Sequence, residues 1–105
     1  MVIIMIRHIV TFKFKDFAEG RSKEENVAIT KSMLDALPAE IDLIKSSFTA
    51  IGAAGANGDN ADLLLISDFE SFEALNAYIV HPKHKAVGEF MRPVRISRAC
   101  IDIEI

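Results

Sequence analysis

Four side chains in this sequence are of the types needed for proton-transfer chemistry. Tyr78, His81 and His84 lie within seven consecutive residues, and His8 lies near the N-terminus. A histidine with its ordinary pKa of about 6.5 can accept a proton at neutral pH. A tyrosine hydroxyl can donate a hydrogen bond to an oxyanion. Removal of a proton next to a carbonyl needs a base and a donor for the resulting oxyanion, so Tyr78 together with a histidine such as His84 could perform this chemistry.

The same residues also have a structural interpretation. His81 precedes Pro82 and can cap and orient the helical segment that follows, and Tyr78 can be an ordinary core residue. His81 and His84 are three residues apart, a spacing that suits two metal ligands on a helix, but a closed zinc site needs a third and usually a fourth ligand. We therefore expect neither a metal nor another cofactor.

Length and composition predict one small globular domain over residues 1–105. Half of the residues are hydrophobic, 26% are charged and the net charge is −3, and a chain of this size is too short for two stable cores. Because charges of both signs are mixed along the chain, neither nucleic acid nor a membrane is expected as a partner. One local excess of positive charge, which would suit an acidic ligand, comprises Lys83, Lys85, Arg92, Arg95 and Arg98.

Cysteine usage and the N-terminus favour a cytoplasmic protein. Cys100 is the single cysteine, so no internal disulfide can form, which suits a reducing compartment. We expect Cys100 to be a small buried residue of the last strand. The apolar run Val2–Ile6 is too short for a signal peptide or a membrane span.

The N-terminal region predicts a strand. Polar and apolar residues alternate over Ile3–Lys15, which places His8, Val10, Phe12 and Phe14 on one face. Further strands are predicted over residues 41–51, 62–69 and 96–105, and the glycines and asparagines between residues 52 and 60 predict a loop.

Two helical regions separate these strands. Ser22 and Glu25 form a capping-box pattern at the start of the first helix, and Pro38 is expected to end it. The apolar face of this helix comprises Val27, Thr30, Met33, Leu34 and Leu37. Ser71 can cap the second helix, whose inner face is expected to include Phe72, Leu75 and Ile79.

Pro82 interrupts the second helical region. A further helical piece is expected over Pro82–Met91, since proline is well accommodated in a first turn, and Pro93 ends it. The resulting order βαββαβ predicts an α+β fold of the ferredoxin-like type, with a four-stranded antiparallel sheet and helices on one face. Apolar residues such as Ile9 on the other face predict a homodimer through the sheet faces.

Three segments together resemble the stress-responsive A/B-barrel (Dabb) family. They are residues 7–15, residues 61–71 and, most specific, the Tyr-x-x-His-Pro-x-His element from Tyr78 to His84. Their order and spacing match the family along nearly the whole chain. The resemblance implies a dimeric α+β barrel, with a cavity between each sheet and its own helices.

The resemblance also implies roles for individual residues, although most members of the family have no assigned activity. A plant cyclase of this family closes a linear polyketide acid by aldol condensation without cofactor or metal. Its catalytic tyrosine and histidine match Tyr78 and His84, and its pocket-lining histidines match His8 and His81. We therefore take Tyr78 and His84 as candidate catalytic residues, and as candidate substrate-binding residues His8, Val10, Phe12 and His81.

Three classes of function follow from these observations. The first is a cofactor-independent cyclase or proton-transfer enzyme on a small carbonyl or acidic substrate. The second is a non-catalytic, stress-responsive or small-molecule-binding homodimer, and the third is a cofactor-independent monooxygenase-like protein. The first helix has no aromatic residue at positions 27–30, where the plant cyclase holds a long-tailed substrate, so a different substrate is expected here.

Overall fold

A four-stranded antiparallel sheet forms the centre of the computed structural model, which describes residues 4–105. Its strands lie in the order β4-β5-β1-β6, as predicted for a ferredoxin-like α+β fold. The bounds are β1 (Ile6–Phe14), β4 (Ser46–Ile51), β5 (Leu63–Phe69) and β6 (Arg95–Glu104). A two-stranded hairpin that the sequence patterns did not predict comprises β2 (Phe17–Ala18) and β3 (Arg21–Ser22).

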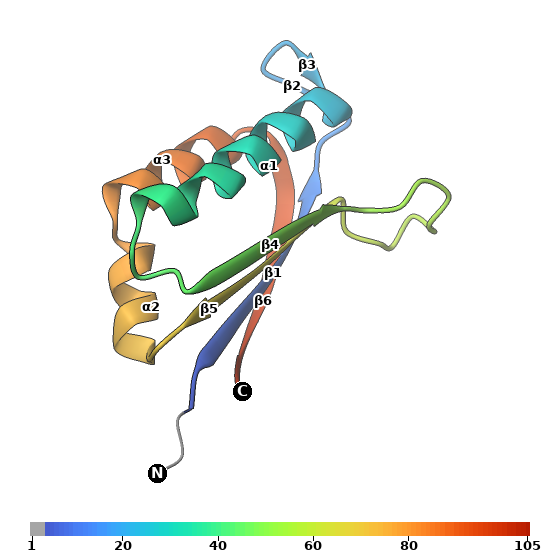
Figure 1. The fold of residues 1–105 in the computed structure, drawn as a ribbon. Helices are drawn as coiled ribbons and strands as arrows, with labels where there is room; N and C mark the ends of the chain where they lie inside the picture. The colour runs from blue at the N-terminus through green and yellow to red at the C-terminus, as the bar shows by residue number, and fades with distance from the viewer. Residues whose placement is uncertain (1–3) are drawn as a thin grey trace.

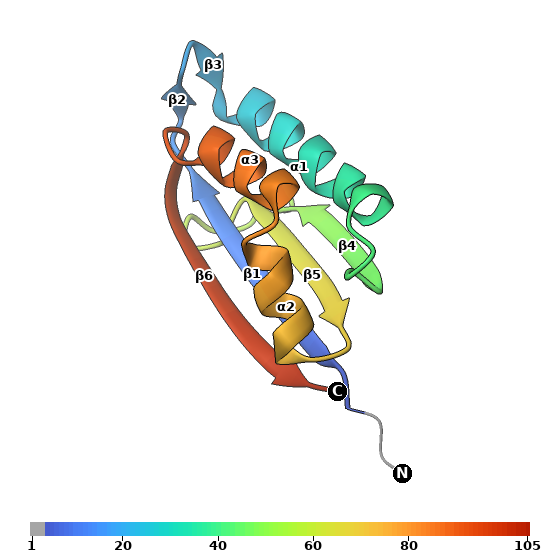
Figure 2. The same cartoon turned by 90° about the vertical axis from the view of Figure 1, so that its left-hand side faces the viewer.

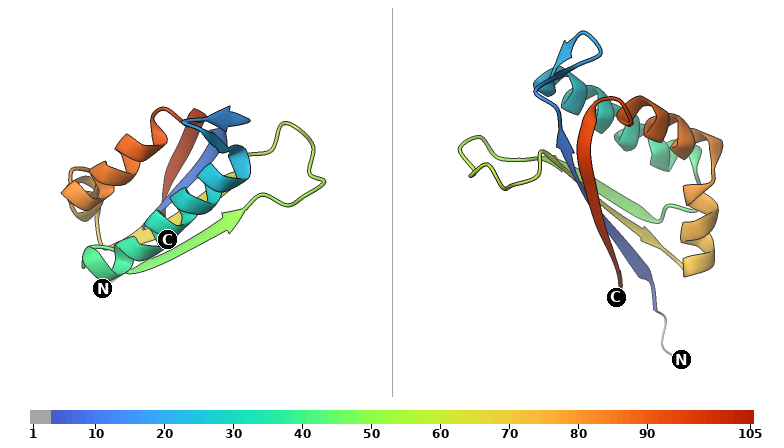
Figure 3. Two further views of the ribbon diagram at one scale, coloured as in Figure 1. Left: turned by 90° about the horizontal axis from the view of Figure 1, so that it is seen from above. Right: turned by 180° about the vertical axis from the view of Figure 1, so that it is seen from behind.

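All three helices lie on one face of this sheet (Figures 1 and 2). They are α1 (Lys23–Glu40), α2 (Phe72–Ile79) and α3 (Pro82–Met91). The opposite face of the sheet carries no helix of the described chain (Figure 3). Within residues 4–105, no helix is long and apolar enough to cross a membrane.

Strict alternation along β1 assigns its side chains to these two faces. Ile6, His8, Val10, Phe12 and Phe14 are buried beneath the helices, and the residues between them are half-buried on the open face. Because successive side chains of a strand point to opposite faces, one strand supplies both the floor of the core and the centre of the open face. The core continues into Phe69, Leu75, Tyr78 and Val94.

Helix α1 begins at the predicted capping box. The backbone N–H of Glu25 donates to the Ser22 hydroxyl, and the Glu25 carboxylate accepts from the backbone N–H of Ser22. The buried side chain of Asn26 then fastens the small hairpin to the helix, because its amide donates to the Ala18 carbonyl at 3.1 Å and accepts from Arg21.

Two predicted boundaries around the end of α1 are wrong. Pro38 lies inside the helix, which continues to Glu40. Proline removes only its own backbone donor, and the helical hydrogen bond from the Ile41 N–H to the Leu37 carbonyl still forms after it. Residues 41–45 form a turn, and β4 begins only at Ser46. The apolar residues Ile41 and Ile44, which suggested a strand, instead anchor this turn in the core.

Three predicted burials are also wrong. Phe72, predicted on the inner face of α2, is 51% exposed, and Ile79 is exposed as well. The inner face consists of Leu75 and Tyr78, so the helix is turned to place the large tyrosine ring in the core. Cys100 is exposed, because it lies on β6, where the helix-facing residues are not covered by the helices.

Candidate functional site

The junction between α2 and α3 positions the candidate catalytic pair. Tyr78 lies in the last turn of α2, and His84 lies in the first turn of α3. Between them, Pro82 occupies the start of α3, where its missing N–H costs nothing. His81 is the N-cap of α3, and its Nδ1 accepts a hydrogen bond of 3.1 Å from the backbone N–H of Lys83. The break therefore brings two side chains from separate helices together.

The aromatic ring of Tyr78 lies at the centre of the site. Its centroid is 4.4 Å from that of His84 and 4.9 Å from that of Phe69 on β5. His8 on β1 meets the same ring edge-on at 6.4 Å. Two helices and two strands therefore contribute to one cluster. Its first and last members, His8 and His84, are more than 70 residues apart in the sequence.

His84 has the protonation state that a general base requires. Its Nδ1 lies 3.0 Å from the carbonyl oxygen of Ile79, and because a carbonyl only accepts, Nδ1 carries a hydrogen. In neutral His84 the lone pair is therefore on Nε2. Burial lowers the pKa of His84 below 6.5, the hydrogen bond to Ile79 opposes this shift, and the positive charge of Arg98 lowers the pKa further. At neutral pH His84 is uncharged and able to accept a proton.

Tyr78 is suited to hydrogen-bond donation. Burial raises the pKa of Tyr78 to about 12, partly opposed by the charge of Arg98, so the hydroxyl stays protonated at neutral pH. The hydroxyl has no hydrogen-bond partner among residues 4–105. No side-chain oxygen or nitrogen in this described region is both sealed from solvent and without a partner. Tyr78 is 1% exposed, so its hydroxyl has at most a narrow contact with solvent, through which it could donate to a ligand.

An aspartate that the sequence analysis did not single out completes the cluster. Asp102 is the register partner of His8 across β1 and β6, and its carboxylate lies 2.5 Å from Nδ1 of His8. The His8 side chain is 4% exposed and that of Asp102 is 30% exposed. The carboxylate can only accept from Nδ1, so it fixes the ring orientation and leaves Nε2 of His8 free. The sequence signal that could have identified Asp102 is the alternation along the last strand, which places Asp102 on one face and Ile101 and Ile103 on the other.

The other predicted binding residues have different surroundings. Val10 and Phe12 lie beyond His8 on the same face of β1, and both are buried in the hydrophobic core. His81 is occupied as the cap of α3. The structure thus brings Tyr78, His84 and His8 together, while roles in substrate binding for Val10, Phe12 and His81 stay predictions.

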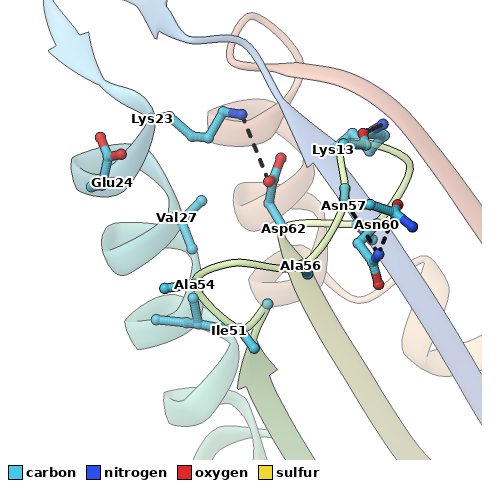
Figure 4. Close-up of a pocket in the computed structure, with 14 residues that line it drawn as sticks. Lys13, Lys23, Glu24, Val27, Ile51, Ala54, Ala56, Asn57, Asn60 and Asp62 are labelled. Atoms are coloured by element: carbon cyan, nitrogen blue, oxygen red, sulfur yellow. Dashed lines mark hydrogen bonds and ion pairs between the residues drawn. The ribbon is translucent and has the colours of Figure 1, made fainter.

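A pocket of about 510 Å³ lies elsewhere, between α1 and the loop at residues 52–62 (Figure 4). Lys13, Lys23, Val27 and Asp62 line it, and Lys23 forms an ion pair with Asp62 at 3.7 Å. Lys13 is five residues from His8 along β1, roughly 17 Å at the usual rise of a strand. The lining of this pocket contains none of the histidines, and the charges of Lys23 and Asp62 pair with each other. The catalytic assignment therefore stays at the α2–α3 junction.

Metal binding receives no support from the geometry of the described chain. His81 and His84 do not share a cluster of three or more His, Cys, Asp or Glu side chains anywhere in residues 4–105. Both histidines also use Nδ1 in hydrogen bonds to the backbone, with Lys83 and Ile79 respectively.

Comparison with known proteins identifies the family. The model of the stress responsive A/B barrel domain, Dabb, matches residues 6–105. The chain belongs to this family. The resemblance noted in the sequence is thereby confirmed over nearly the entire Dabb chain.

Relatives of this Dabb chain include an enzyme and dimers of unknown function. Olivetolic acid cyclase from Cannabis sativa is 26% identical over 88 residues, which are 83% of each protein. A dimeric ferredoxin-like protein of unknown function from Bacteroides fragilis is 30% identical, with 96% of both chains covered and a TM-score of 0.78. Another such dimer, from Thermobifida fusca, is 24% identical, covers 97% and 92% of the two chains and has a TM-score of 0.81.

The hydrogen bonds predict opposite tautomers for two neighbouring histidines. Neutral His84 should carry its proton on Nδ1, because that atom donates to Ile79, whereas neutral His81 should carry it on Nε2, because its Nδ1 accepts from Lys83. Two-bond ¹H–¹⁵N correlation spectra at pH 8 distinguish the two forms. The same spectra followed to lower pH should give His84 a pKa below 6.5. A shared tautomer, or a raised pKa for His84, would contradict this geometry.

Proposed function

We propose that this Dabb protein is a cofactor-independent enzyme that removes a proton next to the carbonyl of a small substrate, as a cyclase or related catalyst. The observation that carries the proposal is the pairing of a neutral His84 with a protonated Tyr78 hydroxyl that has no hydrogen-bond partner among residues 4–105. Their ring centroids are 4.4 Å apart. One substrate could therefore place its carbonyl oxygen at the Tyr78 hydroxyl and the neighbouring carbon at His84. The similarity to olivetolic acid cyclase supports the same choice of residues.

The proposed reaction begins with proton transfer. Nε2 of His84 takes a proton from the carbon next to the substrate carbonyl, and the electron pair of the broken C–H bond moves to form an enolate. The Tyr78 hydroxyl donates a hydrogen bond to the enolate oxygen and remains protonated. In a cyclase, the enolate carbon then attacks a second carbonyl of the same molecule, and protonated His84 returns the proton to the new alkoxide.

His8 and Asp102 have a supporting role in this scheme. The carboxylate of Asp102 holds His8 by Nδ1, and His8 in turn packs edge-on against the Tyr78 ring. Nε2 of His8 can accept a hydrogen bond from a substrate hydroxyl or from water. His8 is therefore assigned to substrate positioning, next to the reacting carbonyl.

The open face of the sheet supports assembly into a homodimer. Phe48, Ile66, Ile9 and Ile101 are successive register partners in one row across all four strands. Phe48 and Ile101 are each 58% exposed, and a second copy packed face to face would bury them. In the adjacent row, Asp68 already accepts from Arg7 and Ser46, so its charge would enter the interface paired. The relatives from Bacteroides fragilis and Thermobifida fusca are dimers.

Deuterium uptake measures the proposed proton transfer without requiring the natural substrate. In D₂O, the protein should accelerate exchange of the protons next to the ketone of 4-oxopentanoate, followed by ¹H NMR. His84→Gln should slow the catalysed exchange by about 10²-fold or more, since the general base is lost. Tyr78→Phe should slow it by roughly 10²-fold through loss of the oxyanion donor.

Matched variants make this result interpretable. Tyr78→Phe removes a hydroxyl that has no partner among residues 4–105, so the melting temperature should be unchanged. Lys45→Gln alters an exposed residue of the turn before β4 and should exchange the ketone protons at the wild-type rate. If wild-type protein and His84→Gln give the same exchange rate, the catalytic assignment is wrong and the non-catalytic binding homodimer replaces it.

The dimer proposal predicts which surface substitutions dissociate the protein. Phe48→Glu or Ile101→Glu places a charge in the proposed apolar interface and should convert a micromolar dimer to monomer in light scattering coupled to gel filtration. Phe72→Glu changes an equally apolar, exposed residue on α2 and should leave the dimer intact. A wild-type monomer, or dissociation by Phe72→Glu alone, would refute assembly through the sheet.

A further inference from the structure

Strand β6 presents uncovered side chains beside the candidate site. Arg98, Cys100 and Asp102 are the register partners of Phe12, Val10 and His8, so they share the helix-facing side of the sheet. All three are exposed, because β6 is the edge strand and lies outside the cover of the helices (Figure 2). The site therefore has an open flank, and β6 supplies the side chains along it.

Within residues 4–105, the positive charges on this flank have no acidic partner at salt-bridge distance. An open hollow is lined by Arg92, Arg95, Ile96, Ser97 and Arg98. Elsewhere, Arg7 forms a two-point ion pair with Asp68. Over residues 4–105, by contrast, no carboxylate lies within 4.0 Å of the three arginines of the hollow, and Arg98 has only a long contact of 3.7 Å to the Cys100 sulfur.

Arg98 also acts electrostatically on the catalytic pair. Burial is the main cause of the raised pKa of Tyr78 and of the lowered pKa of His84. The charge of Arg98 lowers both of these pKa values. Arg98, Cys100 and Asp102 project from β6 to the same side of the sheet. The Arg98 guanidinium reaches along the strand toward Cys100, with a nitrogen 3.7 Å from its sulfur, and therefore lies on the flank that leads to Asp102 and His8.

We infer that Arg98 binds a carboxylate of the substrate, so that the site acts on small oxo acids. This inference rests on the proposed function of the same site. A guanidinium fork matches the two oxygens of a carboxylate, and Arg92 and Arg95 add attraction at longer range. Asp102, four residues along β6, repels an anion. The acid is therefore oriented with its carboxylate at Arg98 and its ketone at Tyr78 and His84.

Binding of such an acid has a signature separate from catalysis. A carboxylate at Arg98 offsets the positive charge that lowers the pKa of His84, so 4-oxopentanoate should raise the pKa of His84. The neutral ketone 2-pentanone lacks the carboxylate and should leave this pKa where it is in the free protein. Because the site is exposed, the effect of the acid should weaken as salt concentration rises.

NMR titration of ¹⁵N-labelled protein at constant ionic strength tests the inference. Arg98→Gln should weaken binding of 4-oxopentanoate roughly tenfold, the effect of losing a hydrogen bond to a charged group. Arg98→Lys keeps the charge but not the fork, and should give an intermediate loss. Lys45→Gln removes one positive charge from the exposed turn before β4, at the opposite edge of the sheet from β6, and should change the affinity less than twofold. Affinity for 2-pentanone should be the same in all four proteins.

The outcomes separate this inference from the proposed function. Equal losses in Arg98→Gln and Lys45→Gln would overturn the carboxylate site, even if both ketones exchange their protons. Binding that depends on Arg98, without catalysed exchange of either ketone, would support the carboxylate site and contradict the proposed catalysis. Inorganic phosphate that binds at Arg98 more tightly than 4-oxopentanoate would overturn the assignment to carboxylic acids.

Discussion

The candidate site depends on the packing of the buried Tyr78 ring. The ring lies against Phe69 from the sheet and meets His84 from the next helix, and it can do so because Pro82 and the His81 cap break the helical region between them. An uninterrupted helix would separate positions 78 and 84 by more than one and a half turns, on different faces. The same burial keeps the phenol protonated and the imidazole neutral. Packing and protonation state thus have one physical cause.

The candidate site and the proposed dimer interface lie on different faces of a single sheet. Along β1, His8 belongs to the helix side and Ile9 to the open side, so adjacent residues serve the site and the proposed interface. The edge strand β6 connects the two roles, because Asp102 holds His8 while Ile101 completes the apolar row. Covering the open face with a second copy would leave the flank at Arg98 accessible, since Arg98 projects to the helix side.

Local patterns predicted most of the fold. The alternation of β1, the capping box at Ser22 and the start of α3 at Pro82 all depend on neighbours in sequence, and the structure confirms them. The errors arose where tertiary packing decides. Ile41 and Ile44 have strand-forming side chains but anchor a turn, and the Tyr78 ring displaced Phe72 from the inner face of α2.

The site was predictable only in part, for a similar reason. Tyr78 and His84 lie in one short motif, and His8 shares a face with buried residues, so their meeting followed from the predicted topology. Asp102 and Arg98 become partners of the site only through the pairing of β6 with β1 and the absence of helical cover over β6. Neither condition can be inferred from a single strand.

The pH dependence of kcat/KM for deuterium exchange into 2-pentanone tests the central claim most directly, because it reports the ionisation of the free enzyme. With neutral His84 as base, the rate should rise with pH to a plateau, with a midpoint below 6.5. The plateau should extend beyond pH 9, because Tyr78 loses its proton only near 12. A midpoint above 6.5, or a decline between pH 7 and 9, would show that this pair does not perform the chemistry.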